Sequence, residues 1–247
     1  MKKLLNWQIL AALVLVFCSV GFYFLHYILF HDLHHIFLYL IGDVAFLFLD
    51  VLIVMLVLHR LLTLKEEKLI RKKLSMIIGV FFGEVGTELL RKLIGLDLGA
   101  AKIGGELRVT NNWSKKEYAR ALRAVEAYKS EIKINKDKLR EIKAFLMARR
   151  GFMLNLLENP NLLEHESFTN LLWSVFHLTD ELGHRVDIDH LPDNDYAHLT
   201  VDINRVYQLV LSQWIGHMRH LENDYPYLFS LAARTNPFTP DASVEIK

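Results

Sequence analysis

The sequence predicts an all-α protein, with a two-helix transmembrane hairpin followed by a cytosolic α-helical bundle. The chain is 52% hydrophobic, with a mean hydropathy of +0.21, and this excess is concentrated in the first sixty-odd residues. Beyond about residue 110, apolar residues recur at helical spacing, and no alternating run is long enough for a sheet. A length of 247 residues suits one or two domains.

The first predicted span covers about residues 7–30, which contain no Asp, Glu, Lys or Arg. At 1.5 Å per residue they would form about 36 Å of helix, enough to cross a hydrocarbon core of about 30 Å. A signal peptide is the alternative interpretation. The run is too long for a typical signal sequence, and no small-x-small cleavage site follows it.

The second predicted span covers about residues 36–62 and completes a hairpin over residues 1–64. Lysines precede the first span and a run of Lys and Arg follows the second, whereas the connecting loop has neither. Because cytoplasmic flanks carry the excess of positive charge, both termini are expected in the cytoplasm. We therefore expect an integral protein of a lipid bilayer, such as a bacterial inner membrane.

Asp43 and Asp50 lie inside the second apolar span, seven residues apart and so on one helix face. A charged side chain at such depth costs about 2.5–3.5 kcal/mol unless it is paired, protonated or hydrated. Three interpretations stay open: pairing within the hairpin, as His26 with Asp43 and Ser19 with Asp50; a polar seam between subunits; or an ion path. Since two helices enclose no pore, an ion path requires several copies, most simply a closed ring whose acidic side chains select cations.

His31, His34 and His35 cluster in the predicted outer loop. Imidazoles suit zinc, copper or nickel, so a divalent metal is one hypothesis for this loop. A simply solvated loop, or a response to pH, is the alternative.

Residues 65–110 are predicted to form a basic and amphipathic juxtamembrane segment. Gly79 and Gly83 are four residues apart, a spacing that permits close helix packing. Glu84 stands among glycines and is either a gate or ion site, or part of a surface or interface helix.

Residues 111–240 are predicted to form the cytosolic helical domain, and residues 241–247 a disordered tail. Ser114 and Glu117 form a capping box that opens one helix, and a second helix follows Asn135 and ends near Asn159. Further helices are expected at about 166–183 and 199–223. The aromatic segment after residue 225 is expected either to pack across the bundle or to contact a partner.

Histidines and carboxylates at helical spacing suggest a second metal hypothesis within this domain. Glu181 and His184 match one Glu-x-x-His step of di-metal bundles, and His177 lies on the same side of that helix. His217 and His220 lie one turn apart on the next helix. The other glutamates of a di-metal bundle are missing, and surface or hydrogen-bonded histidines are the alternative.

Several classes of function find no support in the sequence. The net charge of +1 gives no general attraction for nucleic acid, and the single cysteine excludes an intrachain disulfide. No phosphate-binding glycine loop and no Gly-x-Ser-x-Gly elbow occur, so enzymatic activity is not expected.

Three hypotheses remain. The first is a homo-oligomeric membrane protein that conducts cations past Asp43 and Asp50. The second is a membrane-anchored regulatory or scaffold protein whose cytosolic helical domain binds a protein partner. The third is a metal-dependent enzyme that uses the histidines of the bundle.

Overall fold

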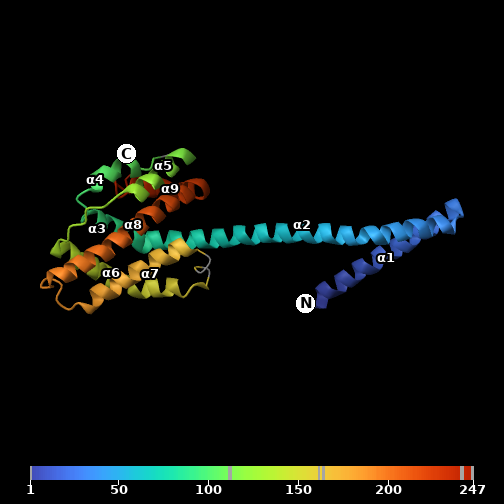
Figure 1. The fold of residues 1–247 in the computed structure, drawn as a ribbon, viewed down its shortest axis with the longest axis horizontal. Helices are drawn as coiled ribbons and strands as arrows, with labels where there is room; N and C mark the ends of the chain where they lie inside the picture. The colour runs from blue at the N-terminus through green and yellow to red at the C-terminus, as the bar shows by residue number, and fades with distance from the viewer. Residues whose placement is uncertain (1, 111–112, 161, 163–164, 240–241, 246–247) are drawn as a thin grey trace. The chain divides into compact units, whose positions relative to one another are not determined.

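The computed structural model describes residues 2–110, 113–160, 162, 165–239 and 242–245. These residues form helices and contain no strand, only an isolated bridge between Asp97 and Ile132 (Figure 1). The prediction of an all-α protein is therefore confirmed. The chain divides into two compact units, residues 1–66 and residues 67–247, which are described separately below.

The first unit consists of α1 (Lys2–Phe30) and the first part of α2 (Leu33–Phe81). His31 and Asp32 connect the two helices, and His31 adopts the left-handed conformation, with φ of 52°. Asp32 caps α2, because its Oδ1 accepts from the backbone nitrogens of His34 at 2.9 Å and His35 at 3.2 Å. The connection is thus shorter than the predicted loop, and His34 and His35 belong to α2.

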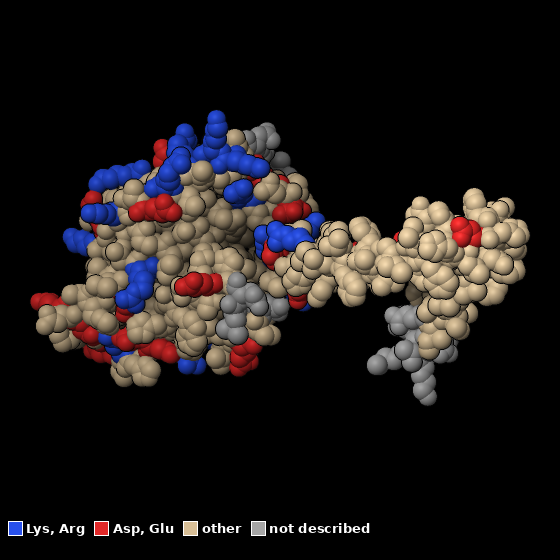
Figure 2. Space-filling view, turned by 45° about the vertical axis from the view of Figure 1, so that its right-hand side comes forward, with Lys and Arg blue, Asp and Glu red and all other residues tan. Residues whose placement is uncertain are grey.

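Both helices have stretches long and apolar enough to cross a membrane, and none of the side chains in the most apolar windows is buried. The face of this unit seen in Figure 2 is almost free of charged side chains, whereas charges of both signs cover the second unit. A core helix of a soluble protein would instead hide most of its apolar side chains.

The second unit begins with the end of α2, a π-helical turn and a set of shorter helices. The elements after α2 are η1 (Phe82–Gly86), α3 (Thr87–Ile94), α4 (Ala100–Gly104), η2 (Gly105–Leu107), α5 (Lys115–Ala127), α6 (Lys136–Leu157), α7 (Glu166–His184), α8 (Asp193–Asp224) and α9 (Pro226–Arg234). The long α8 packs along α7, and also against α3, α5 and α9, while α6 packs on α7. The capping box at Ser114 and the N-cap at Asn135 form as predicted.

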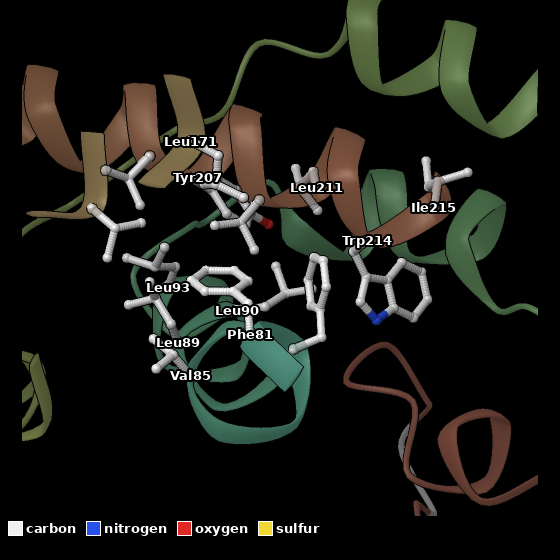
Figure 3. Close-up of a cluster of buried hydrophobic side chains, with 14 of the residues drawn as sticks. Phe81, Val85, Leu89, Leu90, Leu93, Leu171, Tyr207, Leu211, Trp214 and Ile215 are labelled. Atoms are coloured by element: carbon white, nitrogen blue, oxygen red, sulfur yellow. The ribbon is translucent and has the colours of Figure 1, made fainter. Parts of the chain in front are cut away.

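The core of this unit forms where the end of α2, η1 and α3 meet α7 and α8 (Figure 3). The ring of Phe81 is fully buried and packs edge-on against Phe168, with ring centroids 5.4 Å apart. Phe82 is equally buried and stacks on the ring of His217. Other fully buried side chains here are Val85, Leu89, Leu90, Leu93, Leu171, Tyr207 and Leu211.

This core corrects the expected domain boundary. Residues 65–110 were predicted to form a separate juxtamembrane segment, with the soluble domain starting near residue 111. In the structure, residues from Leu74 to Val109 supply part of the core, and the unit begins at Glu67. Leu89, Leu90 and Leu93 are buried because α3 presents its apolar face to α8, which glycine spacing alone does not reveal.

The aromatic segment after residue 225 packs against the bundle, as the first of its two interpretations predicted. Phe229 and Phe238 are buried, and the side chain of Asn236 donates to the carbonyl of Leu107 at 3.0 Å. Residues 240, 241, 246 and 247 lie outside the described residues. Within the predicted disordered tail, Ser243 and Val244 form hydrogen bonds with Arg234, so this part of the tail is ordered against α9.

Asp97 joins the turn after α3 to the segment that follows α5. It is 7% exposed and accepts hydrogen bonds from Tyr128 Oη at 2.6 Å and from the backbone nitrogens of Gly99 at 3.0 Å and Glu131 at 2.9 Å. Burial, with Asp97 beside it, raises the pKa of Tyr128 above its ordinary range. Loss of this carboxylate would leave three donors without an acceptor.

We expect Asp97→Ala to lower the free energy of unfolding by about 3 kcal/mol, because hydrogen bonds to a charged acceptor are stronger than neutral ones. Urea titration of the full chain in detergent measures this loss. Asp137→Ala removes an aspartate whose side chain is 76% exposed and is the matched control, expected within about 0.5 kcal/mol of wild type. Equal losses in the two variants would contradict this role for Asp97.

Candidate functional sites

Asp43 and Asp50 lie on α2 with exposed side chains. Among the described residues, neither carboxylate has a hydrogen-bond or ion-pair partner within the chain. The two carboxylates are thus available to groups outside this chain.

The pairing of these aspartates with His26 and Ser19 does not form. His26 instead stacks on His35, with ring centroids 5.9 Å apart and ring planes at 12°, and its Nδ1 is buried without a hydrogen-bond partner. Ser19 is exposed. Among the described residues, rings close to the turn link α1 and α2, and no hydrogen bond or ion pair joins Asp43 or Asp50 to α1.

The histidines near the turn are not brought to a common point. The ring of His31 lies 6.0 Å from that of Tyr27, while His35 lies between His26 and Tyr39. His34 begins α2 beside the capping Asp32. Within the described residues, these three histidines do not form a metal-binding group by ligand-atom distance.

Glu84 lies in the π-helical turn η1 and is exposed. Its Oε2 is 3.3 Å from Arg149 Nη1 of α6, an ion pair on the surface of the second unit. Of the two glycines predicted for helix packing, Gly79 faces His217, since a Cβ there would lie 3.8 Å from His217 Cε1. A Cβ on Gly83 would meet no atom within 4 Å. The structure thus gives Gly79 a close neighbour and leaves open space beside Gly83.

Both glycines line a cavity of about 630 Å³ between the end of α2, α8 and α9. Apolar side chains make up most of its wall, including Met76, Trp214, Met218, Leu221, Leu228 and Leu231. A cavity of this size and character is typical of a site for an apolar ligand or side chain.

His217 is the titratable group in the cavity wall with the most perturbed pKa. It is 9% exposed, stacks on Phe82 at 4.8 Å with ring planes at 8°, and its Nδ1 is buried without a hydrogen-bond partner. Burial lowers the pKa of His217 to about 4, with a smaller contribution from the nearby His220. His220 itself faces Asp224, with Nδ1 2.8 Å from Oδ2. Neutral His217 can therefore accept or donate one hydrogen bond in the wall of this apolar cavity.

The histidines predicted as one bundle site lie in separate places. His184 Nδ1 contacts the carbonyl of Asp180 at 2.7 Å, at the end of α7. His217 and His220 line the cavity. The remaining pair, His177 and Glu181 on α7, instead meets two residues of α8 that sequence reasoning missed, His198 and Asp202.

The signal for these residues is a repeated spacing. His177 precedes Glu181 by four residues, and His198 precedes Asp202 by four, so each pair shares one helix face. Asp202 Oδ2 lies 3.4 Å from His177 Nε2 and 3.3 Å from His198 Nε2. The packing of α7 on α8 brings the two faces together.

The low pKa of His217 predicts a loss of stability in mild acid. The unfolded chain takes up a proton on His217 near pH 6.5, and the folded chain only near pH 4. Between these values the unfolded state binds more protons than the folded state, so the free energy of unfolding falls as the pH falls from 6.5 to 4. We expect the free energy of unfolding to fall by about 3 kcal/mol more in wild type than in His217→Leu over this range. Urea titrations at several pH values measure the difference.

The control for this effect is His190→Leu, because the side chain of His190 is 81% exposed. This variant should follow the wild-type pH profile. A profile of His217→Leu that is parallel to wild type would show that His217 does not contribute the acid sensitivity.

Comparison with known proteins covers nearly the whole chain. Residues 2–62 match the family model described as MJ1433, N-terminal helical domain, and residues 70–234 match that of Uncharacterized protein MJ1433, C-terminal helical domain. The boundary between the two compact units falls in the gap between these matches. No solved structure matches the chain. Uncharacterized protein MJ1433 of Methanocaldococcus jannaschii is 40% identical over 233 residues, 94% of each chain. The chain therefore belongs to the MJ1433 family of two-domain helical proteins.

Proposed function

We propose that this protein is an integral membrane protein whose copies associate through the α2 face that carries Asp43 and Asp50. In this proposal α1 and the first part of α2 cross the bilayer, and the aspartates of several subunits form a polar, cation-attracting path. The observation that carries the proposal is that both carboxylates lie in an apolar helix and have no partner among the residues that the structure describes.

Membrane insertion is supported by the length of the two apolar stretches and by the exposure of their side chains. The apolar stretch from Ile9 to Phe30 comprises 22 residues, about 33 Å of helix at 1.5 Å per residue, and none of its most apolar window is buried. A signal sequence would account for the first helix alone. The second apolar stretch, within α2, is similarly unburied and follows it directly.

Self-association is supported by the energetic cost of isolated charges in hydrocarbon. At about 2.5–3.5 kcal/mol each, two lipid-facing aspartates on one helix would strongly oppose insertion. Placing the shared face against the same face of other copies gives the carboxylates polar neighbours and water. A ring of such side chains would concentrate cations by charge.

The flanking charges favour an orientation for this arrangement. Lys65, Lys68, Arg71, Lys72 and Lys73 follow the second apolar stretch, while the turn at His31 and Asp32 has no Lys or Arg. Under the positive-inside rule we expect both termini on the cytoplasmic side of the cell membrane. The bundle would then lie in the cytoplasm.

The test is the mass of the protein in nanodiscs together with cation flux into liposomes. Wild type is expected as a multiple of its 28.8 kDa chain, with a measurable cation flux. Asp43→Asn and Asp50→Asn should each lower the flux at least tenfold, because they remove the charge that attracts the cation. Glu66→Gln removes an exposed carboxylate beyond the apolar stretch and should leave the flux unchanged.

A wild-type monomer in nanodiscs would refute self-association. An oligomer whose flux is equal in wild type and both aspartate variants would refute the cation path and favour a second function, a membrane-anchored protein whose bundle binds a partner. The apolar cavity beside His217 is the observation that favours this second function, since it is large enough to admit an inserted side chain or ligand.

A further inference from the structure

The buried carboxylate of Asp202 has one cationic partner among the described residues, Arg205, which faces one of its two oxygens. Its side chain is 2% exposed, and neither oxygen has a hydrogen bond of acceptable geometry. Arg205 Nη1 lies 2.9 Å from Oδ1, so one cation faces one oxygen without a well-directed hydrogen bond. Oδ2 faces two imidazoles. Because burying a carboxylate is costly unless its oxygens are paired or coordinate a metal, an ion between Oδ2 and the two imidazoles would lower that cost.

The distances around Oδ2 are those of a metal site more than those of ion pairs. A charge-assisted hydrogen bond to a carboxylate spans about 2.7–2.9 Å. The Nε2 atoms of His177 and His198 lie farther away, at 3.4 and 3.3 Å. Two ligand atoms that are each about 2.1 Å from a zinc ion, at a tetrahedral angle, lie about 3.4 Å apart. The three ligand atoms all lie within 4.8 Å of one another, so a point between them suits an ion.

Glu181 lies beside the two histidines of this group. Glu181 Oε2 lies 3.7 Å from His198 Nε2, and Oε1 lies 3.9 Å from His177 Nε2. Arg185 holds Oε2 at 2.6 Å and is itself held by both oxygens of Asp195 at 2.8 and 2.7 Å. Glu181 is thus fixed in place, with Oε1 turned toward His177.

The site is also open to solvent. The side chains of His177 and His198 are 49% and 51% exposed, whereas Asp202 lies behind them. An ion could enter from solvent between the imidazoles and keep a water molecule on its outer side. Two imidazoles and a carboxylate are a ligand set that suits zinc and other divalent first-row metals.

We propose that His177, His198 and Asp202 bind a divalent transition-metal ion between α7 and α8, with Glu181 facing the fourth position. Within the described residues, these are the three side chains whose ligand atoms lie close enough together to share one ion. The site lies wholly in the second unit and does not depend on the proposed membrane function. The ion would also join the two helices, so binding would stabilise the bundle.

The test uses the full chain in detergent after removal of metal with a chelator. The histidines near the turn could also bind zinc, so His31, His34 and His35 are changed to alanine in every sample. Isothermal titration with Zn²⁺ is expected to give one ion per chain. Co²⁺ should give the intense visible absorption of a tetrahedral site, a readout that a purely structural role for these residues would not produce.

The His177→Ala and His198→Ala double variant should lower the Zn²⁺ affinity at least 100-fold and abolish the Co²⁺ absorption. Both side chains are half exposed, so the variant should fold, as circular dichroism would verify. Asp202→Asn retains the shape of the buried side chain and should weaken binding at least tenfold. The matched control is His190→Ala, which breaks an exposed histidine–carboxylate pair with Asp187 and should bind as the parent does.

Saturating Zn²⁺ should also raise the unfolding midpoint of the parent and of His190→Ala, but not that of the double variant. The proposal is overturned if the parent binds no Zn²⁺ in this titration. It is equally overturned if the folded double variant retains parental affinity and the Co²⁺ spectrum.

Discussion

The packing of Phe81 and Phe82 into the bundle is the interaction on which the rest of the second unit depends. Phe81 meets Phe168 edge-on, and Phe82 stacks on His217, so one turn of chain contacts both α7 and α8. These rings fix the end of α2 in the core. They also bring Gly79 against His217 and form one wall of the cavity. The buried imidazole stays neutral because this same apolar wall excludes water from it.

Among the described residues the bundle buries two carboxylates, those of Asp97 and Asp202, which differ in how many hydrogen bonds they accept. Asp97 is buried with three hydrogen-bond donors and is thereby part of the fold. Asp202 is buried more deeply, with Arg205 paired to one oxygen, two imidazoles near the other, and no hydrogen bond of good geometry. Since a fully satisfied carboxylate stabilises a structure and an unsatisfied one opposes it, the contrast separates a structural group from a candidate binding group.

The helix starts could be predicted from the sequence, because a helix cap depends only on residues that are neighbours along the chain. The capping box at Ser114 and the N-cap at Asn135 require only adjacent backbone, and both formed. The site depends on the register of α7 against α8, which local spacing does not set. Local spacing therefore favours the Glu181–His184 step and does not indicate that His198 and Asp202 face His177. The early start of the bundle does not follow from local pattern, because four glycines in residues 95–105 favour a boundary there, whereas tertiary packing buries the residues on both sides of them.

The π-helical turn η1 sets the face that α3 presents to the core. A π turn accommodates an extra residue relative to an α-helix, which rotates everything after it by about 100°. Removal of one residue from this turn would swing Leu89, Leu90 and Leu93 away from α8, even though every side chain remained. The number of residues from Phe82 to Gly86 is therefore constrained in addition to their identity, since a Cβ on Gly86 would lie 2.6 Å from the ring of Phe82. A one-residue insertion or deletion here would disrupt the packing of the bundle without changing any buried side chain.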